Sequence, residues 1–183
     1  MESLNFIDIM QAALHIIPLT NNPYTVSALA TIIIETVANG GSVSFMHPMS
    51  LQEATGFWES SLAAAERGER IVLGAFEDDA LVGTLTLLLQ CPPNQPHRAE
   101  LAKMMTSVRY RGRGIARALV AEAERLAITH GKTILNLDTA EEEGAGGFYE
   151  KLGYQRVGII PDFALKPHGG LTGTIIYYKR LGQ

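Results

Sequence analysis

The chain has 183 residues and one cysteine, and its 46% hydrophobic and 19% charged residues are typical of a globular protein and exclude a disordered one. The length predicts a single domain over residues 1–183 with its core at about 14–181, and the net charge of −4 argues against broad binding to nucleic acid or membranes. A cytoplasmic location is expected for three reasons. Cys91 is the one cysteine, the N-terminal segment lacks the basic start of a signal peptide, and no apolar run is long enough for a membrane span.

The N-terminal half predicts two helices between short apolar strands. A strand is expected over residues 14–19, ending at the turn-forming segment 20–23. Apolar periodicity predicts a helix over residues 25–38. Ser50 and Glu53 have capping-box spacing, which predicts a second helix from Ser50 to about Arg67. The apolar runs 70–77 and 80–90 flank two aspartates and indicate an antiparallel hairpin.

The C-terminal half alternates strands with helices. Strands are expected over residues 98–106 and 133–139, with a helix over residues 112–130 between them. A short helix over 145–152 and strands over 154–160 and 172–181 complete the chain. The order β-α-α-β-β-β-α-β-α-β-β indicates an α/β fold, a mixed sheet with helices on its faces. The strand–helix–strand unit over 98–139 should form a parallel pair.

The segment RGRG at residues 111–114 places two glycines directly before the best helical pattern of the chain. A helix N-terminus presents unpaired backbone N–H groups and partial positive charge, and glycines let a ligand approach the backbone closely. The turn is therefore suited to phosphate oxygens. Its spacing fits neither the Walker pattern nor the three-glycine dinucleotide fingerprint. The alternative is a glycine-rich turn with solvated arginines.

Two motifs resemble the GCN5-related N-acetyltransferases. RGRGIA at residues 111–116 is similar to the family signature Q/R-x-x-G-x-G/A, and AGGFYEKLGYQRVG at 145–158 is similar to its later A-x-x-F-Y-E-K-x-G-F/Y segment. The resemblance extends over residues 16–181 and implies a three-layer fold whose sheet is splayed at the cofactor site. Segments 35–46 and 136–154 resemble a branch that modifies small molecules, the tabtoxin resistance acetyltransferases.

The resemblance implies transfer of an acetyl group from acetyl-CoA to a primary amine of a small molecule by direct attack. It also implies that the CoA pyrophosphate binds the turn and that the pantetheine arm lies along the end of the 98–106 strand. The implied cofactor-binding residues are Met104, Met105, Thr106, Arg111, Gly112, Arg113, Gly114, Ile115, Ala116 and Arg117. Two alternatives stay open: a protein N-terminus or lysine as acceptor, and an acyl-CoA-binding module without catalysis.

Glu100 is a candidate general base, because an alkyl amine must lose a proton before it attacks. Strand alternation places Glu100 on one face with Ala102 and Met104, and Lys103 on the other face with Leu101 and Met105. The resemblance implies that such a glutamate acts through water. A salt bridge from Glu100 to a neighbouring basic residue is the alternative.

Asp138 and Tyr149 are the other catalytic candidates. Asp138 stands near the end of a strand, where it is placed to bind or deprotonate the substrate ammonium, or to cap the following turn. The resemblance implies that Tyr149 is a general acid toward the CoA sulfur, with packing on the sheet as the alternative.

The loop after the first helix is the expected wall of the acceptor site. It contains two glycines followed by Phe45 and Met46, which together with Asp138 are the predicted substrate contacts. The five histidines show no metal-ligand spacing, so no metal is expected. A homodimer is common in the family that the chain resembles.

Overall fold

The computed structural model describes residues 14–141 and 146–182, and its element order is the predicted one. The elements are β1 (Leu14–Pro18), α1 (Pro23–Ala38), α2 (Leu51–Glu66), β2 (Arg70–Glu77), β3 (Ala80–Leu88), β4 (Arg98–Thr106), the 3-10 turn η1 (Val108–Tyr110), α3 (Ile115–Thr129), β5 (Ile134–Ala140), α4 (Gly146–Lys151), β6 (Gln155–Leu165) and β7 (Leu171–Arg180). The predicted start of the last helix at Ala145 lies outside the described residues.

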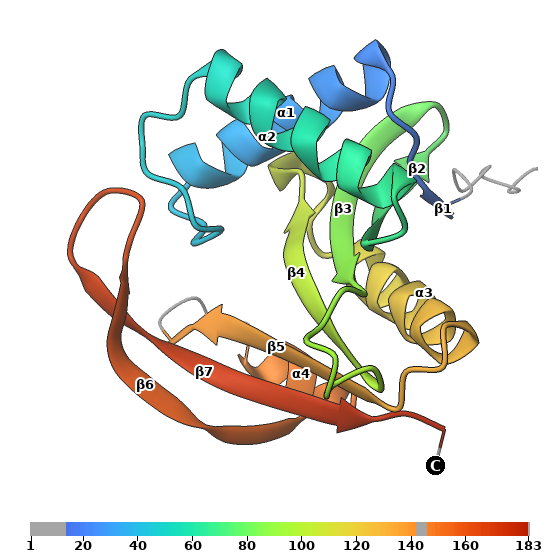
Figure 1. Cartoon of the computed structure of the whole chain (residues 1–183). Helices are drawn as coiled ribbons and strands as arrows, with labels where there is room; N and C mark the ends of the chain where they lie inside the picture. Colours follow the sequence, from blue (N-terminus) through green and yellow to red (C-terminus); the bar gives the residue numbers. More distant parts are fainter. Residues whose placement is uncertain (1–13, 142–145, 183) are drawn as a thin grey trace, which may run out of the picture.

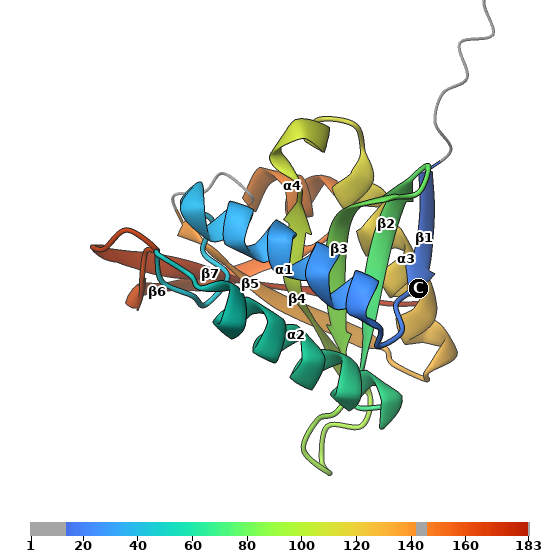
Figure 2. The same cartoon turned by 90° about the horizontal axis from the view of Figure 1, so that it is seen from above.

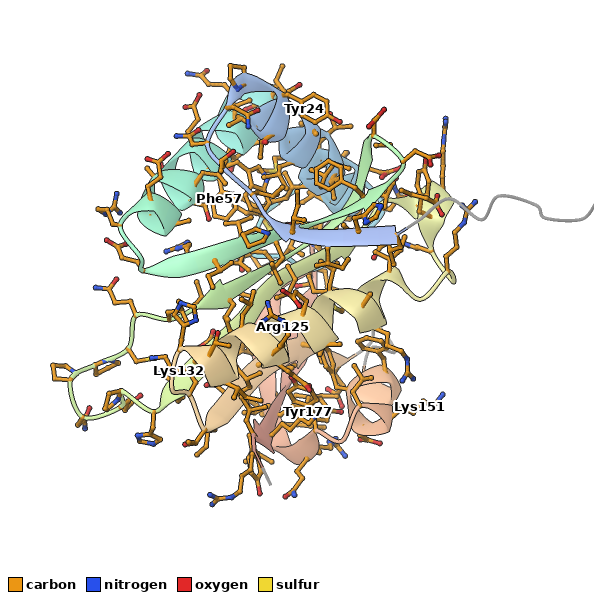
Figure 3. All side chains as sticks on the ribbon, turned by 90° about the vertical axis from the view of Figure 1, so that its right-hand side faces the viewer. Tyr24, Phe57, Arg125, Lys132, Lys151 and Tyr177 are labelled. Atoms are coloured by element: carbon orange, nitrogen blue, oxygen red, sulfur yellow. The ribbon has the colours of Figure 1, made fainter. Side chains whose placement is uncertain are left out.

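One mixed sheet forms the middle of three layers. Its strand order is β1-β2-β3-β4-β5-β7-β6, and only β4 and β5 run parallel. Helices α1 and α2 cover one face, and α3 and α4 cover the other (Figures 1 and 2). Figure 3 shows the same separation from the side, with Phe57 on α2 and Arg125 on α3 on opposite sides of the sheet. These layers confirm the predicted fold class.

Each face of the sheet has its own apolar core. The core under α1 and α2 is built around the fully buried residues Trp58, Leu29 and Ile33. The core under α3 and α4 includes Leu119 and Leu137, which are equally inaccessible. Leu135 and Leu137 point to this second core, so Asn136 and Asp138 point to the opposite, open face of β5 as strand alternation requires.

Local capping explains where the first two helices begin. The side chain of Asn22 accepts a hydrogen bond from the Thr25 N–H at 2.9 Å, and Pro23 occupies the first turn, so α1 begins two residues before the predicted start. Ser50 Oγ accepts from the Glu53 N–H at 3.1 Å and begins α2, as the capping pattern predicts.

Helix α3 begins three residues later than predicted. Gly112 and Gly114 both have left-handed backbone angles, with φ of 78° and 82°, and such angles do not continue a right-handed helix. The segment between the 3-10 turn and Ile115 is therefore an open, non-helical turn. The helix itself ends at Thr129, one residue before the expected His130.

The sheet is splayed between β4 and β5, as the family resemblance implies. The two strands pair only over residues 98–100 and 134–136, although β4 continues to Thr106 and β5 to Ala140. Figure 1 shows the strands diverging beyond this short contact. The edge of β4 that faces β5 therefore has no strand partner after Glu100, while its other edge stays paired with β3.

A bulge in β4 overturns the predicted alternation. Lys103 has φ of 51°, and the β3–β4 register shifts beside it. Met104 consequently packs against the α3 core, and Met105 is buried in the α1–α2 core. The prediction that Met104 lies on the same face as Glu100 is therefore wrong. One extra residue in the strand moves every following side chain to the opposite face.

Strand β6 extends to Leu165, five residues beyond the predicted end, and pairs antiparallel with β7 along its length. The tip of this β6–β7 hairpin contacts the loop after α1. The His47 N–H donates to the Pro167 carbonyl at 2.9 Å, and His168 Nε2 lies 3.1 Å from the Ala38 carbonyl oxygen. Within the described residues, no helix is long and apolar enough to span a membrane.

Candidate active site

A cavity of about 920 Å³ lies where β4 and β5 separate. Most of its lining comes from five parts of the chain: the loop after α1, β4 from Glu100 onward, the glycine turn with the first turn of α3, the end of β5 with α4, and the β6–β7 hairpin on both sides of its tip. Tertiary contact therefore brings most of the predicted site residues into one space: Glu100, Met104, Met105, Thr106, Arg111, Gly112, Gly114, Ile115, Ala116, Arg117, Asp138 and Tyr149.

The glycine turn forms an open cradle at one end of the cavity. A Cβ atom added at Gly112 or Gly114 would meet no heavy atom within 4 Å, so the space beside both residues is available to a ligand. The backbone N–H groups at the start of α3 have no partner within the helix. This geometry is suited to an anion, because the helix dipole adds positive potential at the same point.

The arginines around the turn have different surroundings. Arg111 and Arg117 are exposed and line the cavity. Arg113 instead points to β2, where its guanidinium pairs with Glu77 at 2.9 Å and lies 5.1 Å from the centre of the Tyr110 ring. The predicted cofactor contact of the Arg113 side chain is therefore not supported, because that guanidinium already has an acidic partner.

Met104, Met105 and Thr106 present the unpaired edge of β4 to the cavity. Unpaired N–H and C=O groups of a strand edge accept an extended ligand as if it were another strand. The side chains have other roles: Met105 is 3% exposed and belongs to the α1–α2 core. The backbone, rather than the thioether, is thus the binding feature at this position.

Tyr149 is buried beside the splayed strands. Its side chain is 5% exposed, it packs between Phe148 and Tyr154, and its hydroxyl points to Met104 Sδ at 3.7 Å. Burial raises the pKa of Tyr149 well above its usual value, and the nearby charge of Asp138 adds to that increase. The phenol is therefore a protonated group next to the free edge of β4.

Asp138 faces the cavity from the open face of β5. Its Oδ2 accepts a hydrogen bond of 2.8 Å from the Thr174 hydroxyl on β7, and the side chain is otherwise exposed. The strand continues to Ala140, so Asp138 is not the cap of the following turn. Its charge is positioned for a cationic group entering the cavity.

Glu100 takes part in a hydrogen-bonded triangle on β4 and β5. Its Oε2 lies 3.4 Å from Arg98 Nη1 and accepts from Asn136 Nδ2 at 3.2 Å, and Arg98 also donates to Asn136 at 2.6 Å. The side chain keeps 35% of its surface exposed and lines the cavity. Glu100 thus forms the ion pair with a neighbouring basic residue that was the alternative to a catalytic role. Its carboxylate nevertheless remains accessible from the cavity.

The acceptor wall differs from the prediction. The loop after α1 contributes residues 39–44 to the cavity lining, whereas Phe45 packs edge-on against Phe57 at 5.0 Å and Met46 points outward, 44% exposed. Phe45 packs toward the α1–α2 core because it contacts the Phe57 ring. Neither Phe45 nor Met46, the two predicted contacts, lines the cavity.

Sequence reasoning missed Thr174, Ser44 and Lys103 as site residues. Thr174 and Ser44 give no signal in the sequence, because long-range contacts alone bring them to the cavity. Lys103 does give one: regular alternation places it among core-facing residues, and a lysine there suggests a break in the strand. Within residues 14–141 and 146–182, no group of three or more metal-ligating side chains comes together.

The sequence profile of the Acetyltransferase (GNAT) family matches residues 42–154, more than half of the chain. The chain belongs to the GNAT family. Its members are N-acetyltransferases, so the protein is an acyltransferase, and its acyl donor is acetyl-CoA. The matched segment contains β4, the glycine turn and Tyr149, which carry the site geometry described above.

Solved GNAT structures share this fold at low sequence identity. A candidate acetyltransferase from Salmonella typhimurium, yncA with its cofactor acetyl-CoA, is 16% identical with a TM-score of 0.76, covering 93% of this chain and 95% of its own. The ribosomal-protein-alanine N-acetyltransferase of Brucella melitensis is 20% identical with a TM-score of 0.76, covering 91% and 99%. A candidate phosphinothricin N-acetyltransferase is 17% identical with a TM-score of 0.74, covering 93% and 100%.

Proposed function

We propose that this GNAT protein transfers the acetyl group of acetyl-CoA directly to a primary amine of a small molecule. The observation that carries the proposal is the single cavity. It joins the open glycine turn and the free edge of β4 to Asp138 and Tyr149, so a donor and an acceptor have room to meet within one space.

The chain's residues fit the two ends of acetyl-CoA. Backbone N–H groups from Gly112 to Arg117 would hold the pyrophosphate, with Arg111 and Arg117 contributing charge. The unpaired edge of β4 at residues 104–106 would hold the extended pantetheine arm. When bound, acetyl-CoA supplies the acetyl group, and CoA then leaves with a free thiol.

Two groups in the cavity match the proton movements of the transfer. The amine nitrogen forms a bond to the acetyl carbonyl carbon, and the carbon–sulfur bond breaks. Asp138 is the better-placed acceptor of the amine proton, because it acts electrostatically on Tyr149, whereas Glu100 is held by Arg98 and Asn136. The Tyr149 hydroxyl would donate a proton to the leaving sulfur, since its raised pKa keeps it protonated.

The closed hairpin tip favours a small acceptor over a peptide. The centres of the His47 and His168 rings lie 4.5 Å apart with the rings tilted by 44°, beside the two hydrogen bonds that join the hairpin to α1 and the loop after it. This contact joins two walls of the cavity, because residues 39–44 of the loop and residues 163–165 of the hairpin both line it. The phosphinothricin neighbour also supports a small acceptor, and an amino-acid-like toxin such as tabtoxin fits the short stretches of resemblance. The ribosomal-protein neighbour supports the alternative, a protein N-terminus.

Gly114→Glu tests the proposed cofactor site, with Gly68→Glu as its matched control. Both glycines have positive φ and open space around the missing Cβ, but Gly68 lies beyond α2 and outside the cavity. Calorimetry should give an acetyl-CoA affinity at least about 10-fold weaker in Gly114→Glu, because the new carboxylate blocks and repels the pyrophosphate. Equal affinities in the two variants would refute the assignment of the turn.

A panel of primary amines with acetyl-CoA tests the reaction itself. Release of free thiol with one or more small amines, and formation of the corresponding amide by mass spectrometry, is the expected result. Acetylation of peptide N-termini alone would favour the protein-acceptor alternative. Absence of thiol release with every amine of the panel would favour the alternative of an acyl-CoA-binding module without catalysis. We further propose a cytoplasmic location and a homodimer, the latter measurable by light scattering.

A further inference from the structure

Lys103 occupies an unusual position in the cavity. The bulge in β4 turns its side chain to the face of the sheet that carries α1 and α2, where its ammonium donates to Ser44 Oγ at 2.9 Å. The same ammonium lies 5.8 Å from the centre of the Phe45 ring and 5.9 Å from that of Phe57. One neutral hydroxyl and two aromatic faces thus surround this positive charge.

The charges in the cavity are unequally matched. Glu100 has Arg98 as its partner, at 3.4 Å. Asp138 has only the Thr174 hydroxyl, and Lys103 only the Ser44 hydroxyl, so neither forms an ion pair within the part of the chain that the structure describes. Both side chains line the same cavity. Besides Arg111 and Arg117 at the glycine turn, the site therefore offers the ammonium of Lys103 and the carboxylate of Asp138 to whatever enters it.

The position of Lys103 is energetically unfavourable without an anion. Burial lowers the pKa of Lys103, and the charges of Asp138 and Glu100 offset this only in part. Removing an ammonium from water without a charged partner is costly. An anionic group beside Lys103 would reverse that effect and would gain a charge-assisted hydrogen bond.

We propose that Lys103, together with the Ser44 hydroxyl, binds a carboxylate of the acceptor, so that the acceptor is an amine that also carries a carboxylate, such as an amino acid. Asp138 would bind the ammonium of the same molecule. This inference rests on the proposed function and names the substrate class of that site. The inference disfavours a protein N-terminus as the acceptor. The α-carboxyl group of an N-terminal residue is part of a peptide bond and carries no charge.

Matched acceptor pairs test the inference. The probes are L-amino acids against their α-carboxamides, and 4-aminobutyrate against butylamine, each measured as kcat/KM with acetyl-CoA. The wild-type enzyme should prefer the carboxylate member of at least one pair. Lys103→Met should reduce that preference roughly 10- to 100-fold, the effect of removing a hydrogen bond to a charged group. Lys103→Arg should restore part of the preference.

Lys151→Met is the control, because Lys151 is exposed at the end of α4 and lies outside the cavity lining (Figure 3). It should keep the wild-type preference. Calorimetry with acetyl-CoA verifies that each variant is folded. If Lys103→Met fails this check, Ser44→Ala serves in its place and should lower the same preference by a smaller factor.

The outcomes separate this inference from the proposed function. Equal use of both members of every pair by the wild type, or an unchanged preference in Lys103→Met, would overturn the role of Lys103 while leaving acetyl transfer intact. Absence of thiol release with every amine tested would instead refute the proposed function, and the inference with it.

Discussion

Tyr149 is the side chain whose chemistry depends most clearly on its surroundings. Its hydroxyl is buried next to Met104, and burial raises its pKa, so the phenol stays protonated at the pH values at which an enzyme works. A protonated phenol beside the free edge of β4 is suited to donating a proton to a leaving thiolate, and unsuited to accepting one from an amine.

Tyr149→Phe should therefore lower kcat by about 100-fold or more, the usual contribution of a general acid, without weakening acetyl-CoA binding. The ring remains, so its packing with Phe148 and Tyr154 is kept. Steady-state kinetics and calorimetry measure the two effects separately. Tyr24→Phe is the control, since Tyr24 is 58% exposed and far from the cavity. A wild-type kcat in Tyr149→Phe would exclude the general-acid role.

Asp138 and Glu100 can be separated by isosteric substitutions. We expect Asp138→Asn to lower kcat/KM by about 100-fold or more and Glu100→Gln by less than about 10-fold. The physical reason is that Glu100 is already engaged by Arg98 and Asn136, whereas Asp138 offers its charge to the cavity. Both variants are assayed with the same acceptor. The reverse order of effects would make Glu100 the base.

At the scale of elements, two irregularities of β4 create the site. The strand separates from β5 after three residue pairs, which opens the cavity, and the bulge at Lys103 redirects the side chains that follow. The β6–β7 hairpin adds another wall of the cavity and contacts the loop after α1. A regular, fully paired sheet would leave neither a free backbone edge nor this enclosed space.

His168→Ala should loosen the hairpin contact, because it removes both the ring that packs against His47 and the contact with the Ala38 carbonyl. We expect the KM of the acceptor to rise several-fold while the affinity for acetyl-CoA is unchanged. The backbone amide hydrogens of Lys166, His168, Gly169 and Gly170 should exchange faster with solvent. His97→Ala is the matched control, an exposed histidine outside the cavity. Unchanged amide hydrogen exchange at the hairpin tip would show that the His168 contact does not stabilise the tip.

At the scale of the whole molecule, one sheet carries an apolar core on each of its faces, and the cavity lies where β4 and β5 separate. Both cores share β4, with Leu101 on one face and Met105 on the other. Strand β2 likewise contributes Val72 to one core and Leu73 to the other. Because neighbouring residues of the same strands belong to both cores, we propose that the chain unfolds as one cooperative domain. Coincident unfolding transitions by fluorescence and circular dichroism would support this.

Stability should decline in alkaline solution. Burial raises the pKa of Tyr149 and Tyr154 above the usual 10.0, so the folded state binds these protons more tightly than the unfolded state does. This contribution to stability is complete below about pH 10 and is lost progressively as the pH rises further. Urea titrations from about pH 9 to about pH 11 should show a falling midpoint, with a shallower fall in Tyr154→Phe than in Tyr24→Phe. An equal fall of the urea midpoint with pH in the two variants would contradict the contribution of Tyr154.

The sequence by itself determined the order of the elements, the start of α2 after Ser50, the start of α1 to within two residues, and the place of the glycine turn. These features depend on local physics: capping hydrogen bonds, apolar periodicity and the backbone freedom of Gly112 and Gly114. The family motifs likewise lie within short segments, so Tyr149 and the turn were both predicted from sequence.

Only the tertiary structure decided what each side chain faces. Phe45 turns to Phe57, Arg113 pairs with Glu77, and the bulge carries Lys103 away from the core that alternation assigned to it. Each outcome depends on a partner distant in the chain or on a single residue inserted in a strand. Local patterns cannot contain that information, because the same periodicity is compatible with either face of the sheet until packing selects one.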